Sequence, residues 1–136
     1  MRVPTAIDHF IAESSIADVI DAHLSGRRVH ALGSVIEHAA LTTHNDPVRH
    51  WNGDHGGHPD DPNRVRGGIE EFRVTEGRYL DVHAWQFTPS SFKTIISMLN
   101  KLHYIDLTPI RVYDPPFGSN EFYAILKGEK SCGIGS

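Results

Sequence analysis

The feature that most constrains the fold is a helix start at Thr88 followed by a regular apolar repeat. Threonine is a good N-cap residue, and Pro89 suits the first helical position, where no backbone N–H donor is needed. Apolar residues then recur at spacings of three and four, at Phe92, Ile95, Ile96, Leu99 and Leu102. The sequence therefore predicts an amphipathic helix from Pro89, with one face that must be buried against another element.

Two strands are expected after this helix. In residues 104–113, apolar side chains alternate with other residues, first at Ile105 and Leu107 and then at Ile110 and Val112. This pattern is typical of a strand that is kinked near Pro109. A turn-rich connection covers residues 114–120. Residues 121–127 form the second expected strand, with apolar residues on both faces: Phe122, Ala124 and Leu126 on one, Tyr123 and Ile125 on the other. We therefore expect both faces of the last strand to be covered.

Two short helices are expected in residues 8–43. Ser14 or Ser15 can cap the first, whose apolar face carries His23 as a partly buried residue, and Gly26 can end it. The second is predicted to begin at Ser34, where Glu37 completes a capping box.

Residues 44–68 are predicted to be a long loop, because they lose apolar periodicity and are rich in histidine, glycine and proline. One or two helical turns are expected at residues 69–76 and a strand at residues 79–87, so that residues 79–127 read as strand, helix, strand and strand. Residues 128–136 are expected to form a flexible tail.

Composition excludes several classes of protein. The formal charge of −4 argues against a nucleic-acid surface, which usually needs a clustered basic excess. No apolar run approaches the roughly 18 residues that span a bilayer, and the single cysteine rules out an internal disulfide. We expect one partial domain in a cytoplasmic protein that binds neither membrane nor nucleic acid.

The segment Asp81-Val82-His83-Ala84-Trp85-Gln86-Phe87-Thr88-Pro89-Ser90-Ser91-Phe92 resembles a stretch of many S-adenosylmethionine-dependent methyltransferases, in which a histidine and aromatic residues precede a Thr-capped helix. The following order of helix, strand, loop and last antiparallel strand also resembles that family. Asp8-His9-Phe10 and residues 16–28 are similar to a helical insertion of a bacterial subgroup whose members are sometimes associated with glycosyltransferases, so the resemblance implies that residues 8–43 are this insertion. The resemblance covers residues 8–127 and implies the C-terminal portion of a Rossmann-like α/β domain, α+β in isolation.

The resemblance implies transfer of a methyl group to a small or sugar-linked acceptor, with this chain as the substrate-side segment. The family binds S-adenosylmethionine through a Gly-rich turn after its first strand, whereas Gly53, Gly56 and Gly57 lie in the predicted loop with no apolar strand before them. We therefore expect the chain alone to bind no cofactor and to be inactive. Residues 1–4 fall where the family finishes its fifth strand, so we expect a truncated or misassigned reading frame, or a split protein. Either predicts self-association or a partner that supplies the N-terminal half.

His83 is the candidate catalytic residue. Alternation along an extended segment would place Asp81, His83 and Trp85 on one face, where the histidine could orient or deprotonate a substrate hydroxyl. The alternative is a structural histidine that hydrogen-bonds the backbone and packs on Trp85, which the lack of an ionisable partner favours.

Arg27 and Arg28 are the other candidate substrate-binding residues. Together with His30, they could meet a phosphate or carboxylate of the substrate. Alternatively, they complement the dipole at the end of the preceding helix, which is our working assumption.

A metal site is a further alternative. His44, His50, His55 and His58 lie near several aspartates, and imidazole and carboxylate are common zinc or nickel ligands. However, no pair falls at a ligand interval on an expected helix, and ordering a loop costs entropy. A non-enzymatic interaction module, binding a partner protein through a sheet edge and the His-rich loop, is the remaining hypothesis.

Overall fold

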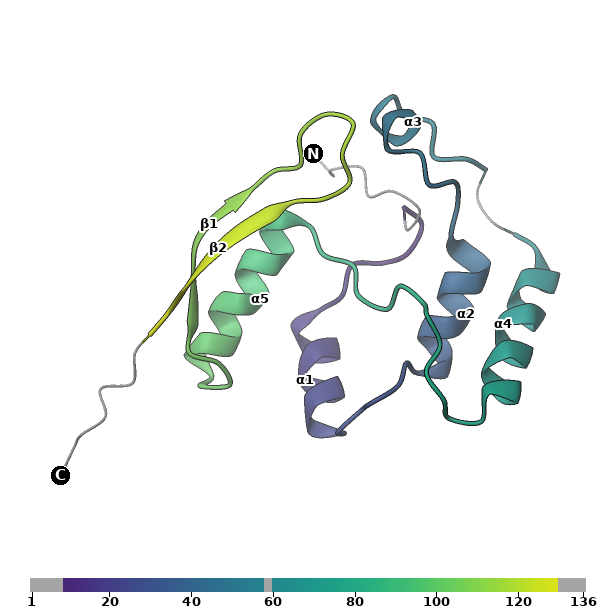
Figure 1. The fold of residues 1–136 in the computed structure, drawn as a ribbon, viewed down its shortest axis with the longest axis horizontal. Helices are drawn as coiled ribbons and strands as arrows, with labels where there is room; N and C mark the ends of the chain where they lie inside the picture. Colours follow the sequence, from purple (N-terminus) through teal and green to yellow (C-terminus); the bar gives the residue numbers. More distant parts are fainter. Residues whose placement is uncertain (1–8, 58–59, 130–136) are drawn as a thin grey trace.

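The computed structural model describes residues 9–57 and 60–129. These contain five helices and a two-stranded antiparallel sheet (Figure 1). In chain order the elements are α1 (Ile16–Leu24), α2 (Leu32–Leu41), α3 (Pro47–Trp51), α4 (Pro62–Thr75), α5 (Pro89–Lys101), β1 (Leu107–Tyr113) and β2 (Tyr123–Gly128). The described residues therefore form a mixed α+β fold.

The C-terminal helix and strands follow the predicted order. Helix α5 begins with a reciprocal capping box, in which Thr88 Oγ1 accepts from the Ser91 N–H at 3.1 Å and Ser91 Oγ accepts from the Thr88 N–H at 2.9 Å. Strands β1 and β2 pair in antiparallel register, with Val112 opposite Ala124. The register shifts between Pro109 and Arg111, which confirms the irregularity predicted near the proline, a residue without an N–H to donate to the ladder.

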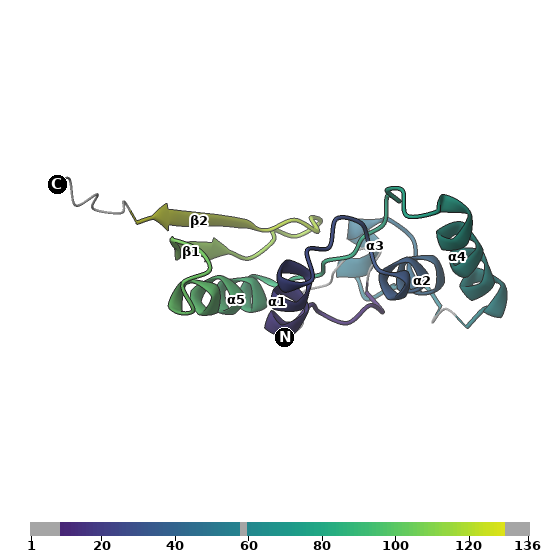
Figure 2. The same cartoon turned by 90° about the horizontal axis from the view of Figure 1, so that it is seen from below.

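Helix α5 covers one face of this hairpin. Phe92 of α5 meets Phe122 edge-on with ring centroids 5.5 Å apart, and Ile95 is 7% exposed. Figure 2 shows the hairpin and α5 as two layers. The opposite face, which the sequence predicts to be covered, is open within the described residues: Tyr123 is 63% exposed and Ile125 51%. Alternation shows which residues share a face, but it cannot show what lies against it.

Helix α1 forms as predicted and α2 begins earlier than predicted. Ser15 caps α1 in a capping box with Asp18. The prediction that α2 begins at Ser34 is wrong, because its N-cap is Ala31, which makes no side-chain hydrogen bond. Glu37 therefore does not complete a capping box, and tertiary packing rather than a local cap sets the start of this helix.

The predicted loop at 44–68 is wrong over much of its length, since it contains α3 and the first half of α4. Both helices start as α5 does, with a capping residue before proline. Asp46 accepts from the Arg49 N–H at 3.1 Å, and Asp61 accepts from the Asn63 N–H at 2.9 Å. The turn-forming residues here start helices, and the turns predicted at residues 69–76 are the second half of α4.

Gly68 lies inside α4 because α2 packs closely against it. A Cβ added at Gly68 would lie 3.0 Å from the Ala39 Cβ and 3.3 Å from the Ile36 Cα. A glycine there is unfavourable for an isolated helix but permits the two backbones to approach.

The predicted strand at 79–87 does not form. This segment is irregular, and its contact with the N-terminal segment runs through Ser14. The Ser14 N–H donates to the Gln86 carbonyl at 2.8 Å, and the Gln86 N–H donates to Ser14 Oγ at 3.1 Å. One of these bonds joins two backbone groups and the other uses the serine hydroxyl, so a side chain takes the place of the second backbone partner that a strand would supply.

The buried core of the described residues is small. Its apolar members are Ile11, Val35, Val82 and Ile95. Many large apolar side chains remain exposed, among them Ile110, Phe117 and Tyr123. No helix in the described ranges is long and apolar enough to cross a bilayer.

Candidate functional site

A cavity of about 500 Å³ lies between α1, α2 and residues 84–86. Among the residues lining it are four that the sequence indicates as candidates for substrate binding: Arg27, Arg28, His30 and Trp85. The reciprocal Ser14–Gln86 hydrogen bonds hold two of its walls together. The structure therefore brings together in space side chains that are far apart in the sequence.

The two arginines differ in their surroundings. Arg27 pairs with Asp21 of α1 at 2.9 Å, which ties its guanidinium back to the helix it follows. Arg28 forms no ion pair within the described ranges and is exposed at the cavity. Arg28 is consequently the cation better placed to meet a bound molecule.

Three carboxylates, which sequence reasoning does not assign to a site, also line the cavity: Glu13, Asp18 and Glu37. Asp18 is the third helical residue of α1 and completes the capping box with Ser15. Glu37 lies on α2, where the capping role predicted for it does not form. The cavity therefore presents both carboxylates and guanidinium groups beside the half-exposed indole of Trp85. Such a lining can hydrogen-bond hydroxyl groups in either direction and offer an apolar face to a ring.

His83 and Asp81 do not line this cavity. The backbone N–H of His83 donates to His38 Nδ1 at 3.2 Å, and the two rings meet edge-on with centroids 5.2 Å apart. Trp85 instead lies nearly parallel to Phe87, at 6.3 Å. Of the candidate site residues, Arg27, Arg28 and Trp85 therefore line the cavity, whereas His83 and Asp81 do not.

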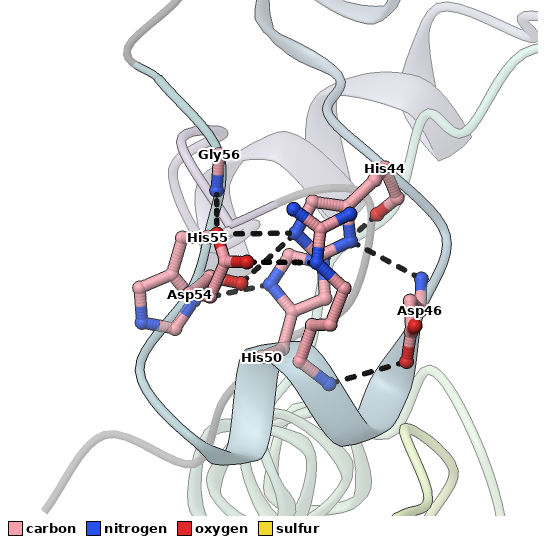
Figure 3. Close-up of polar contacts among 7 residues, drawn as sticks. His44, Asp46, His50, Asp54, His55 and Gly56 are labelled. Atoms are coloured by element: carbon pink, nitrogen blue, oxygen red, sulfur yellow. Dashed lines mark hydrogen bonds and ion pairs between the residues drawn. The ribbon is translucent and has the colours of Figure 1, made fainter.

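A second site, the histidine cluster, consists of His44, His50 and His55 around α3, with His9 beside them (Figure 3 shows the first three). His50 is 1% exposed, and both of its ring nitrogens have partners. Its Nε2 lies 2.9 Å from the His44 carbonyl oxygen and its Nδ1 lies 3.0 Å from His55 Nδ1. Because a carbonyl only accepts, His50 Nε2 carries a proton, and in the neutral ring Nδ1 accepts from His55.

His44 is held in the same way. Its Nε2 lies 2.9 Å from the Asp54 carbonyl oxygen and its Nδ1 accepts from the Asp46 N–H at 3.3 Å. The His44 and His50 rings stack with centroids 4.2 Å apart, and His9 stacks on His55 at 3.6 Å. These contacts use both His44 and His50 as neutral imidazoles with one donor and one acceptor nitrogen.

Burial is the main cause that lowers the pKa of His50, and the nearby His44 and His55 lower it further. The hydrogen bond to the His44 carbonyl and the charge of Asp54 oppose this shift. The pKa of the Asp54 carboxyl is lowered, first by the hydrogen bond from Arg49 Nε at 2.7 Å and then by the one from the Gly56 N–H. The cluster therefore favours neutral His50 beside an ionised Asp54.

The described part of the chain contains no set of side chains that could bind a metal ion. His58 lies outside the described residues, and no three or more His, Cys, Asp or Glu side chains elsewhere in those ranges are arranged to hold a metal ion. His50 and His55 instead use their facing nitrogens for each other.

The described residues also do not fit S-adenosylmethionine. Their strands form a single hairpin, and no Gly-rich turn joins a strand to a helix within residues 9–57 and 60–129. Gly53 follows α3, and Gly118 lies between β1 and β2. The close backbone approach that this cofactor needs is therefore missing from these residues.

Comparisons of this chain with protein-family models, with curated proteins and with solved structures find no match.

Proposed function

We propose that this chain is the substrate-side segment of an S-adenosylmethionine-dependent methyltransferase domain, and that other residues bind the methyl donor. The observation that carries the proposal is the unequal cover of the β1–β2 hairpin. Helix α5 covers its inner face, while Tyr113, Tyr123 and Ile125 remain exposed on the other face. A hairpin at the end of a larger sheet with helices on both faces would have this arrangement.

The small core supports the same proposal. A globule of about 150 residues normally buries over two-thirds of the surface of its unfolded chain. Here the described residues leave many large apolar side chains exposed. A second set of strands and helices packed on the hairpin would bury part of this surface and complete the sheet.

The cavity lined by Arg28, Trp85 and Glu37 is the proposed acceptor site. Its mixed guanidinium, carboxylate and indole lining suits a polar, hydroxyl-bearing molecule, and its volume of about 500 Å³ lies in the range of small-molecule sites. When bound, S-adenosylmethionine would supply the methyl group. The residues of this chain would hold and orient the acceptor.

The proposal is tested by calorimetric titration with S-adenosylhomocysteine. We expect no binding to this chain alone and binding when it is mixed with the cofactor-binding half of a methyltransferase of the resembled type. Amide hydrogen exchange should then show that the β2 amides that do not pair with β1 are protected only in the mixture. Micromolar binding by the chain alone, or equal exchange of these β2 amides with and without the other half, would contradict the proposal.

A non-enzymatic interaction module is the second candidate function, favoured by the same exposed hairpin face together with the histidine cluster. The mass of the protein in solution, measured by size-exclusion chromatography with and without a chelator, distinguishes the two candidate functions. Assembly that the chelator disrupts would favour the interaction module, because methyl-group transfer as proposed needs no metal held by these histidines.

A further inference from the structure

Helix α3 connects the histidine cluster to the β1–β2 connection. His50 lies on α3 within the cluster. Trp51, the next residue of α3, contacts the segment that connects β1 and β2. The Trp51 indole N–H donates to the Ser119 carbonyl at 2.7 Å, and its ring lies 5.6 Å from that of Phe117. Two adjacent residues of one short helix thus join two parts of the molecule.

The hydrogen bond between His50 and His55 requires that Nδ1 of His50 carries no proton. If Nδ1 of His50 gains a proton, it becomes a donor that faces His55 Nδ1 at 3.0 Å. His55 can then accept only by changing its tautomer. A second proton on this pair would place two N–H groups face to face, so the pair cannot keep its hydrogen bond once both rings are charged.

The other rings of the cluster add to this effect. His44 loses its acceptor for the Asp46 N–H when it is protonated, and His9 stacks on His55, where two imidazolium rings would repel each other. The opposing charge is Asp54, whose carboxylate accepts from Arg49 and from the Gly56 N–H and lies 3.8 Å from His44 Nε2. The β1–β2 connection on the other side of α3 carries the carboxyl side chains of Asp114 and Glu121.

We propose that α3 is an acid-sensitive latch: the neutral cluster of His44, His50 and His55 holds α3 in place, α3 holds the β1–β2 connection through Trp51, and protonation of the cluster releases both. The direction follows from linkage. His50 is harder to protonate in the folded than in the unfolded chain, since burial lowers its pKa from 6.5. The latch is therefore fully closed above about pH 6.5, and its contribution is lost as the pH falls through the lower folded-state pKa of His50.

The experiment measures the fluorescence and the indole N–H resonance of Trp51 in the full chain. The chain carries Trp85→Phe, so that Trp51 is the only tryptophan. Between pH 8 and pH 5 we expect a red shift of its emission and the loss of the downfield indole N–H resonance, with a midpoint below pH 6.5. Adding His50→Gln should abolish this acid transition, because glutamine can still donate to the His44 carbonyl but does not titrate. Adding His103→Asn, at an exposed left-handed position outside the cluster, should leave the transition unchanged.

A transition that is absent from the Trp85→Phe chain, or that is the same with and without His50→Gln, would overturn the proposal. If the His50→Gln chain does not fold, the Trp85→Phe chain alone decides by NMR. There the imidazole resonances of His50 and the Trp51 indole resonance should titrate with one midpoint. Separate midpoints would overturn the latch.

Discussion

The α5–β1–β2 unit and the region around α3 differ in what stabilises them. In the first, apolar side chains provide the contacts: Phe92 of α5 packs on Phe122, and Ile95 of α5 is buried. In the second, imidazole nitrogens, carbonyl oxygens and one indole N–H hold a helix of five residues. Apolar packing does not depend on protonation, whereas hydrogen bonds through imidazole change when the ring gains a proton. The two regions should therefore respond differently to the same change in conditions.

The largest effect should come from the apolar contact. Ile95→Ala removes a buried side chain of α5 and should lower the free energy of unfolding by about 2–5 kcal/mol. Ile110→Ala is the control, because Ile110 is 58% exposed and lies at the register shift. Chemical denaturation measures both, and equal losses for the two variants would show that α5 does not bury the hairpin as described.

The close packing of α2 on α4 gives the next effect. Gly68→Val forces a branched side chain against Ala39 and the α2 backbone and should destabilise the fold by about 1–3 kcal/mol. Gly67→Ala is the matched control, since a Cβ there meets nothing within 4 Å, and it should stabilise α4 by up to about 1 kcal/mol. Thermal unfolding checks the opposite signs, and a destabilising Gly67→Ala would mean that α4 is not a formed helix.

Loss of the α5 cap should have a smaller effect. Thr88→Ala removes the acceptor for the Ser91 N–H and should cost about 1 kcal/mol. Thr88→Ser keeps a hydroxyl and should retain most of that stability. If the alanine and serine variants unfold at the same denaturant concentration, the cap contributes nothing to this unit.

The smallest effect on stability should come from the open hairpin face. Ile125→Lys places a charge at a position that is 51% exposed, so the free energy of unfolding should change by less than about 0.5 kcal/mol. Self-association, measured by sedimentation at increasing protein concentration, should decrease. The control is Lys101→Gln on α5, away from this face, and equal association of the two variants would show that the hairpin face is not the contact.

Local sequence signals were sufficient where a cap and an apolar repeat agree. Thr88-Pro89 and the repeat that follows predict α5, and Ser15 predicts α1. The same type of start at Asp46-Pro47 and Asp61-Pro62 is hidden by the glycines and histidines around it, so the sequence suggests a loop there. The presence of Gly68 makes sense only once α2 lies against it, because intrinsic helix propensity takes no account of a neighbouring backbone.

The amino-acid sequence by itself determined the two capped helices, the order of α5, β1 and β2, and the irregularity at Pro109, because caps, periodicity and proline act over a few residues. Only the tertiary structure decided which chemical groups meet. It placed Arg28 and Trp85 around one cavity, kept His83 away from it, and joined His50 to His55 and Trp51 to Ser119. These contacts link separate segments through hydrogen bonds and packing, and their partners carry no periodic signal that a single sequence could reveal.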